Sequence, residues 1–385
     1  MEVYLDNSAT TKAYPEVADI VVKCMLEDYG NPSSLHNKGL DAEHIVKNSA
    51  EIIAKTIKCR PDEIVFTSGG TESNNMAIVG TALSKRRKGK HIIVSAIEHA
   101  SVTAVMHFLQ NEDYEITYIE PDEHGICKAE DFAAAVREDT ILVSCMHINN
   151  EIGSIQPVAE IAKACKAVNK DLYVHVDAIQ SYGKIEIYPS RNNIDLMSVS
   201  GHKLHGPKGT GFLFIKNNTL IRPIIYGGGQ QKNMRSGTEN VPGIAGLGKA
   251  VELTFKDFDK RIAYIKGLKE RLISGLTAID EVYSNSIIED DLGAPHIASI
   301  SFTGVRAEVM LHALEDKGIF VSSGSACSSN KKKDSSVLKS IGLPGDRIES
   351  TLRFSFSENN TEEEIDYVID VVNEILPMLR HYVRG

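Results

Sequence analysis

Residues that could do chemistry stand directly after the strand-length apolar runs of this 385-residue chain. Lys203 follows Ser200 and Gly201 at the end of one run, where poor solvation favours the neutral amine and frees it to form a Schiff base. Asp177 ends a second run and could keep the nitrogen of an aromatic ring protonated. Two alternatives stay open: Lys208, in GPKG, competes for the role of the amine, and Asp177 could simply cap a helix.

A Gly-Gly-Thr turn follows a third apolar run, in EIVFTSGGTESNNMAI. Gly70 and Thr71 would open a helix whose free backbone N–H groups and dipole favour a phosphate, although an ordinary strand-to-helix turn with a hydroxyl cap is the plainer interpretation. A phosphate site, a Schiff-base lysine and a carboxylate for a pyridinium nitrogen together describe pyridoxal phosphate. His99 and Asn150 follow two other apolar runs, Gln180 follows the run that Asp177 ends, and all three should converge on the same crevice.

Cys327 differs from the other five cysteines because its neighbours, in SSGSACSSNKKKDSS, are small or polar. Cysteine is usually buried, and Cys24 and Cys145 fit that rule in a helical and a strand-like pattern. A thiol on a polar surface loop indicates reactivity instead. No C-x-x-C pair occurs, so neither a structural metal site nor a disulfide framework is predicted.

The elements that must position these residues alternate along the first two thirds of the chain. Strand-length runs separated by helix-length segments predict an α/β fold with a mostly parallel sheet covered by helices on both faces. The predicted strands are 63–68, 91–96, 115–120, 141–148, 173–178, 195–200 and 211–216.

From about residue 255 the pattern changes to a second, α+β arrangement. A long amphipathic helix is followed by IASISF, another helix, the Cys327 loop, LRFSFS and a last helix that opens with a capping box, Thr361 and Glu364. We therefore predict three parts: an N-terminal arm at 1–13 that packs with the small domain, a large cofactor-binding domain at 14–255, and a small domain at 256–385 that carries the cysteine loop.

The composition excludes several classes of protein. A formal net charge of −10 argues against broad nucleic-acid binding, and the most basic stretch, SKRRKGKH at 84–91, is typical of a solvated turn between a helix and a strand. No apolar run is long enough to cross a membrane, and the N-terminus lacks the pattern of a signal peptide. We expect a cytoplasmic protein.

Motifs spread over residues 4 to 357 closely resemble those of the cysteine desulfurases of the NifS and IscS kind. The motifs are YLDNSATT (4–11), TSGGTESNN (67–75), MHINNEIG (146–153), HVDAIQSYGK (175–184), SGHKLHGPKG (200–209), RSGTENVPG (235–243) and SSGSACSS (322–329). The resemblance implies a class-V aminotransferase with the fold of the aspartate aminotransferases, dependent on pyridoxal phosphate and dimeric. It also implies conversion of L-cysteine to L-alanine with a persulfide left on the enzyme.

The resemblance gives roles to the residues around the cofactor ring. Lys203 becomes the Schiff-base lysine and Asp177 the partner of the pyridinium nitrogen. Gln180 contacts the ring hydroxyl, and His99 stacks on the ring and shuttles protons. Asn150 lies beside the cofactor and also faces the substrate.

The phosphate is assigned to residues from two subunits. Gly70, Thr71, Ser200 and His202 would hold it within one chain, and Thr238 would reach it from the other. Relatives often have Ala-Thr-Glu where this chain has Gly-Thr-Glu at 70–72, a departure expected to matter little because the contact there is a backbone N–H.

Asn150 and Arg353 are expected to bind the substrate carboxylate, for which a guanidinium offers bidentate geometry. Cys327 would accept the sulfur, and its polar loop indicates the long-loop class, in which a tethered thiol both attacks the substrate and carries the persulfide to an acceptor protein. The acceptor would be an iron–sulfur scaffold, where Cys327 could be a transient cluster ligand, or a tRNA-thiolation protein. Lys331–Lys333 would solubilise the loop, lower the thiol pKa or meet an acidic acceptor.

Several other functions stay open at this stage. A selenocysteine lyase or a C–S lyase would use the same cofactor residues. An aminotransferase leaves the loop cysteine without a role, and a non-catalytic scaffold protein would have no need of both Lys203 and Cys327.

Overall fold

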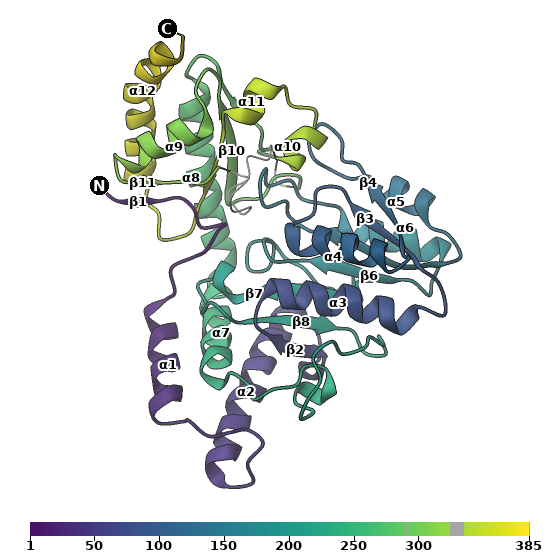
Figure 1. Cartoon of the computed structure of the whole chain (residues 1–385). Helices are drawn as coiled ribbons and strands as arrows, with labels where there is room; N and C mark the ends of the chain where they lie inside the picture. Colours follow the sequence, from purple (N-terminus) through teal and green to yellow (C-terminus); the bar gives the residue numbers. More distant parts are fainter. Residues whose placement is uncertain (290, 324–334, 385) are drawn as a thin grey trace.

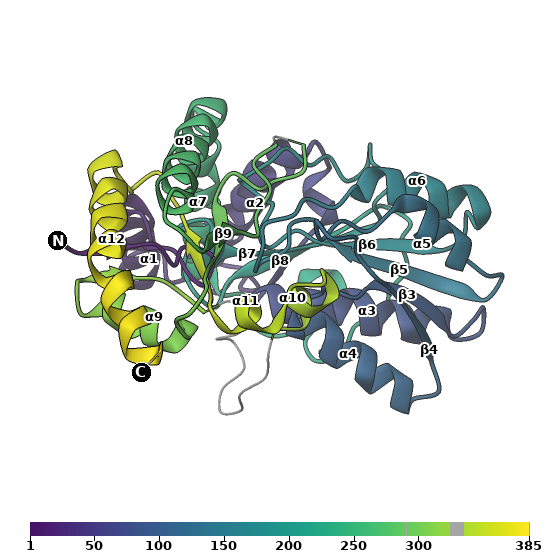
Figure 2. The same ribbon diagram turned by 90° about the horizontal axis from the view of Figure 1, so that it is seen from above.

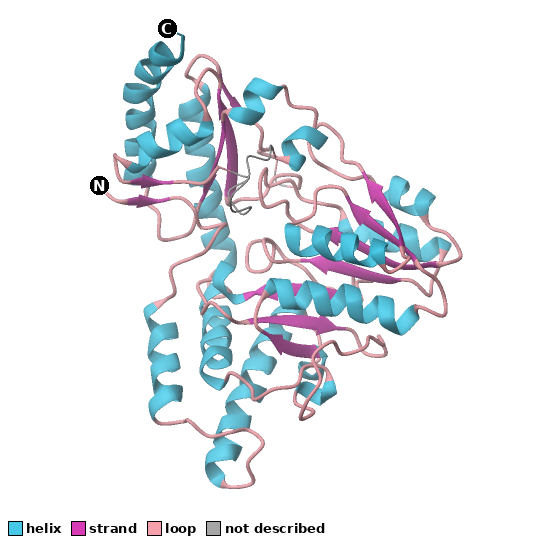
Figure 3. Cartoon of the chain, viewed as in Figure 1, coloured by secondary structure: helices cyan, strands magenta, loops and turns pink. Residues whose placement is uncertain are grey.

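A seven-stranded sheet forms the centre of the larger part of the molecule (Figures 1 and 3). The computed structural model describes residues 1–289, 291–323 and 335–384. The strands follow the order β2-β8-β7-β6-β5-β3-β4, and β8 alone runs antiparallel to its neighbours in this sheet. Their bounds are β2 Ile64–Thr67, β3 His91–Ser95, β4 Glu115–Ile119, β5 Thr140–Met146, β6 Tyr173–Asp177, β7 Leu196–Ser200 and β8 Gly211–Ile215. The predicted strands and the mostly parallel sheet are confirmed.

Helices cover both faces of this sheet (Figure 2). One face carries α3 (Gly70–Lys85) and α4 (Ala100–Asn111), and the other carries α2 (Asn37–Ile57), α5 (Ala129–Ala135), α6 (Val158–Val168) and α7 (Val241–Thr254), with α1 (Pro15–Leu26) packed against α7. In β3, Ile92 and Val94 pack with α3 and α4, whereas Ile93 packs with the helices of the opposite face. Because successive strand side chains point to opposite faces, a strand covered on both sides reads as a continuous apolar run.

A second hydrophobic core lies in the smaller part of the molecule. Its antiparallel sheet has the order β12-β10-β9, and β1 pairs in parallel with β11. The bounds are β1 Val3–Tyr4, β9 Val282–Ser284, β10 Ile297–Phe302, β11 Ile319–Phe320, β12 Thr351–Ser355, α8 Phe258–Thr277, α9 Ala307–Glu315 and α12 Glu362–Arg384. The capping box is confirmed, since Thr361 N donates to Glu364 Oε2 at 3.1 Å and Glu364 N donates to Thr361 Oγ1 at 3.2 Å.

Two short helices, α10 (Ser336–Ser340) and α11 (Gly345–Glu349), precede β12 where the sequence pattern predicted only loop. The side chain of Ser335 caps α10 by accepting a hydrogen bond from Leu338 N at 3.1 Å. Val337, Leu338 and Ile341 pack into the core of the large sheet rather than that of the small one. Cys327 and Lys331–Lys333, just before these helices, lie outside the described residues. No helix in the described part of the chain is both long and apolar enough to cross a membrane.

Candidate active site

A cavity of about 260 Å³ opens where the carboxyl ends of the parallel strands meet the N-terminal arm and β12. The predicted site residues that line it are Gly70, Thr71, His99, Asn150, Asp177, Gln180, Ser200, His202, Lys203 and Arg353. Thr238 does not line it: this residue is exposed, on the loop after the 3₁₀ turn η3 (Gln231–Asn233). Strand-end residues far apart in sequence are thus brought to one point, as expected for a parallel sheet.

Lys203 ends the 3₁₀ turn η2 (Gly201–Lys203), directly after β7. Its Nζ donates to the carbonyl oxygens of Ser8 at 2.5 Å and Ala9 at 2.7 Å. The N-terminal arm therefore holds the amine at the edge of the cavity. Lys208, the competing lysine, is exposed and lines a neighbouring recess beside Gly69.

Asp177 is buried at the end of β6 with both carboxylate oxygens engaged. Asn74 Nδ2 donates to Oδ2 at 2.8 Å, and Ile179 N donates to Oδ1 at 2.9 Å. Burial raises the pKa of Asp177, whereas these hydrogen bonds and the charges of His99 and Lys203 oppose the rise. The chain continues as turns rather than as a helix, so Asp177 is not a helix cap.

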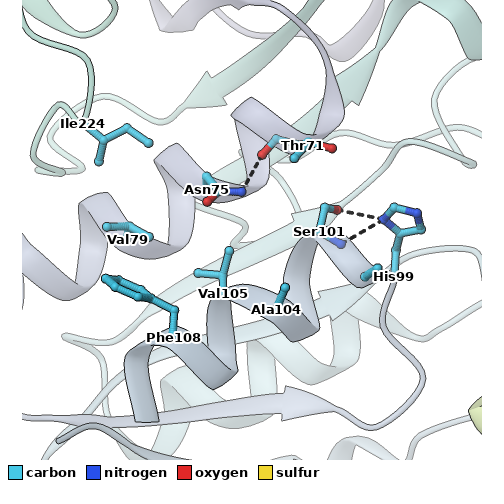
Figure 4. Close-up of a pocket in the computed structure, with 10 residues that line it drawn as sticks. Thr71, Asn75, Val79, His99, Ser101, Ala104, Val105, Phe108 and Ile224 are labelled. Atoms are coloured by element: carbon cyan, nitrogen blue, oxygen red, sulfur yellow. Dashed lines mark hydrogen bonds between the residues drawn. The ribbon is translucent and has the colours of Figure 1, made fainter. Parts of the chain in front are cut away.

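His99 caps α4 and is held in one tautomer by Ser101 (Figure 4). Its Nδ1 accepts hydrogen bonds from Ser101 N at 3.1 Å and from Ser101 Oγ at 2.9 Å, and the same hydroxyl accepts from Asn74 Nδ2 at 2.8 Å. Burial and the charge of Lys203 lower the pKa of His99, against the opposing charge of Asp177. The neutral ring therefore carries its proton on Nε2.

The start of α3 closes the end of the cavity where an anion would bind. Gly69 has a φ of +144°, which only glycine adopts readily, and a Cβ on Gly70 would lie 2.1 Å from Ile179 Cδ1. Glycine at position 70 leaves room for the side chain of Ile179, which follows β6, against the first turn of the helix. Burial, with the charges of Lys203 and Lys208, lowers the pKa of His202 to about 4, so this side chain is neutral near pH 7.

Arg353, on β12, is buried but keeps part of its guanidinium free. Its Nη1 donates to Asn150 O at 2.7 Å and its Nη2 to Asp6 Oδ1 at 2.9 Å, while Nε has no hydrogen-bond partner among the described residues. A guanidinium has five N–H donors, so donors remain for a ligand carboxylate.

Sequence reasoning missed the residues that orient this set. Asp6, Asn74 and Ser101 belong to the motifs YLDNSATT, TSGGTESNN and EHAS, yet nothing in their spacing indicated which side chains they contact. Glu98 was also missed. Burial raises its pKa to about 8, assisted by the charge of Asp177 and opposed by hydrogen bonds from Ser95 and Met146 N, so it adds no full negative charge beside Asp177 at pH 7.

An open groove of about 630 Å³ continues from the cavity between α3 and α4 (Figure 4). Thr71, His99 and Ser101 line both hollows, and the far end of the groove is apolar, with Phe108 half exposed beside Val79 and Ile224. In a single chain, the groove that leads into the cavity therefore exposes an apolar surface to solvent.

Comparison with known proteins gives consistent matches over almost the whole chain. The family model "Aminotransferase class-V" matches residues 3–368. "Cysteine desulfurase IscS" of Dictyoglomus turgidum is 43% identical over 98% of this chain and 95% of its own length. A solved "NIFS-LIKE PROTEIN" superimposes with a TM-score of 0.93 at 36% identity, covering 98% of this chain and 100% of that one. The structure "SspA in complex with cysteine" has a TM-score of 0.78 at 32% identity, over 92% and 99% of the two chains.

Proposed function

Because this chain belongs to the class-V aminotransferase family, and within it to the cysteine desulfurases, we propose that it converts L-cysteine to L-alanine and leaves the sulfur as a persulfide on Cys327. The observation that carries the proposal is the convergence of Lys203, Asp177 and Arg353 on one cavity. An amine, a buried carboxylate and a guanidinium with free donors suit a cofactor and an amino acid bound side by side.

The members of this family depend on pyridoxal phosphate, and the residues present fit it. The glycine-lined start of α3 suits the phosphate, Asp177 the pyridine nitrogen, Gln180 the ring hydroxyl and Lys203 the aldehyde carbon. Bound there, the cofactor would supply an electron sink for the substrate carbons. Ser200 and His202 would complete the phosphate site.

The protein's own residues would bind the substrate and move its protons. Arg353, held by Asp6 and Asn150, would pair with the substrate carboxylate through its free N–H groups. The Lys203 amine would act as a base, and neutral His99, which carries its proton on Nε2, would give up that proton and take it back. Hydrogen bonds from Ser101 keep the His99 ring turned so that Nε2 is the atom available for transfer.

Cys327 would take the sulfur by nucleophilic attack. Its thiolate would form an S–S bond to the substrate sulfur while the substrate Cβ–S bond breaks; the electron pair of that bond would stay on the carbon, which then takes up a proton to become the methyl group of alanine. Burial raises the thiol pKa of each described cysteine: Cys24, Cys59, Cys127, Cys145 and Cys165. This supports Cys327 as the nucleophile, because the thiolate is the reactive form.

The acceptor of the persulfide would be another protein, an iron–sulfur scaffold or a tRNA-thiolation enzyme, and the site of action would be the cytoplasm.

Incubation with L-cysteine and a thiol reductant tests the activity: equal amounts of alanine and sulfide are expected. Faster alanine release from selenocysteine than from cysteine would favour the selenocysteine lyase. Pyruvate and ammonia in place of alanine would reject the proposal in favour of a C–S lyase.

The working unit would be a homodimer in which Thr238 enters the site of the other chain. Thr238 is exposed and does not line the described cavity of its own chain, and Arg235 Nε holds the same loop on α3 by donating to Glu72 Oε1 at 2.8 Å. Large apolar side chains are also exposed along α1 and the loop after it, namely Val22, Met25, Leu26, Tyr29 and Leu35. A second copy of the chain would cover surface of this kind.

Mixing two inactive variants tests the shared site. Thr238→Ala should weaken cofactor binding by about 10- to 100-fold, the loss of one hydrogen bond to a charged group. In a heterodimer of Thr238→Ala with Lys203→Ala chains, one site keeps both Lys203 and Thr238, so parental cofactor affinity at about half of the sites is expected. Cofactor titration of purified heterodimers measures this. Affinity equal to that of the Thr238→Ala homodimer would place Thr238 outside a shared site.

A further inference from the structure

A second group of buried ionisable side chains lies outside the cavity and joins the two parts of the molecule. Glu358, on the turn after β12, is its centre. Tyr14 Oη donates a hydrogen bond to Oε1 of Glu358, while Arg261 Nη1 and His205 Nε2 lie 3.4 Å and 3.5 Å from Oε2. Lys184 Nζ is buried nearby and has no hydrogen-bond partner among the described residues.

These neighbours keep Glu358 ionised. Burial acts to raise its pKa, but the adjacent His205 ring and the charges of Lys184 and Arg261 hold the pKa well below its usual range. Removing one member of such a group would leave the others as uncompensated buried charges. The carboxylate thereby ties together the start of α1, the turn after Lys203, and α8.

The His205 end of the contact lies beside the cofactor lysine. His205 is the second residue after Lys203, and its φ is +60°, a conformation that is unfavourable for residues with a Cβ and persists where the surroundings fix it. His205 N donates to Thr11 Oγ1 at 2.7 Å, and its Nδ1 donates to Lys12 O at 2.7 Å. Because Nδ1 donates to a carbonyl, the other ring nitrogen, Nε2, is the atom that faces the Glu358 carboxylate, 3.5 Å from Oε2.

The Glu358 end follows β12, the strand that carries Arg353. Glu358 is five residues after Arg353, and hydrogen bonds fix the intervening chain. Ser357 N donates to Asn360 Oδ1 at 3.0 Å, and Asn360 Nδ2 donates to Tyr4 O at 3.0 Å. A displacement of Glu358 therefore moves a segment continuous with the strand that carries Arg353.

We propose that Glu358 is a positioning residue: its pairing with His205 holds the turn that carries Lys203 in register with the strand that carries Arg353. This rests on the proposed function, which makes Lys203 the cofactor lysine and Arg353 the carboxylate receptor. A role in stability alone would explain why the group is buried. It would not explain why the partner of Glu358 is His205, a residue with left-handed backbone only two positions after Lys203.

Two substitutions, one on each side of the contact between Glu358 and His205, test the proposal. Glu358→Gln removes a negative charge at nearly constant size, and His205→Asn removes the imidazole with a residue that tolerates left-handed backbone. Each is expected to slow the incorporation of pyridoxal phosphate into the cofactor-free dimer about tenfold, measured as borohydride-reducible cofactor, because a misplaced lysine reacts more slowly. Both should also move the pH midpoint of the bound cofactor's visible absorbance in the same direction. The double variant should be no slower than the slower single one, because both changes break one contact.

The matched control is Asp366→Asn, which removes the same charge from an exposed ion pair with Arg271 on the small part of the molecule; it should leave both measurements unchanged. If the pH midpoints of the Glu358→Gln and His205→Asn proteins moved in opposite directions, charge alone would explain the effect and the positioning role would be wrong. The role would also be wrong if both cofactor measurements matched those of the parent protein and only the unfolding temperature fell. Neither result touches the proposed function, which the Lys203→Ala experiment decides independently.

Discussion

The Lys203→Ala protein is expected to fold, to form no borohydride-reducible bond with pyridoxal phosphate, and to lose turnover of L-cysteine by about 10³-fold or more, since in the proposed function the same amine would serve as cofactor anchor and proton-transfer group. The structure gives the reason: Lys203 lines the cavity that also contains Asp177 and Arg353. Visible absorbance after reduction and alanine release measure the two losses.

Lys208→Ala is the matched control, because Lys208 is an exposed lysine of the same turn region. It should keep the visible absorbance and most of the activity. If the reducible bond persisted in Lys203→Ala and vanished in Lys208→Ala, the assignment of the cofactor lysine would be wrong.

The parts of the site that the sequence predicted are those that follow apolar runs. Asp177 ends β6 and Lys203 closely follows β7, the neighbouring parallel strand. The edge shared by the carboxyl ends of these strands is where a parallel sheet gathers polar residues. Knowledge of the strands and their direction was therefore enough to place both residues at one cavity. The same reasoning applies to His99 after β3 and Asn150 after β5.

The residues that orient this set could not be predicted in the same way. Asp6 reaches Arg353 across 347 positions, and Asn74 reaches Asp177 across 103. Such contacts depend on how the N-terminal arm and α3 pack on the sheet, which leaves no periodic signal in the sequence. Glu358 is a further case, since a glutamate near the start of a helix is normally a solvated residue.

Short elements were missed for a related reason. Strand β9 and the helices α10 and α11 are only three to five residues long, so neither a period of 2 nor one of 3.6 can be recognised in them. Val337 and Leu338 pack into the large core, although the surrounding chain suggested that they belong with the small domain. Tertiary packing, rather than local pattern, decides where such segments lie.

The Cys327→Ser protein should separate cofactor chemistry from sulfur transfer. The residues that would bind cofactor and substrate line one cavity in the described part of the chain, so the variant is expected to bind pyridoxal phosphate and to change its absorbance on addition of L-cysteine. A hydroxyl is almost wholly protonated at neutral pH and is a much weaker nucleophile than a thiolate. Alanine release should therefore fall to background while cofactor content stays at the parental level.

Cys59→Ser provides the control for loss of a thiol elsewhere. Cys59 is partly buried, and its burial, with the charges of Glu63 and Asp62, raises its pKa to about 12, so it carries almost no thiolate near pH 7. This variant should release alanine at the parental rate and still form a persulfide, detected by mass spectrometry after brief exposure to L-cysteine. Were Cys327→Ser to produce alanine and sulfide as fast as its parent, the persulfide route through this residue would be untenable, and direct elimination by a lyase would become the better account of the site.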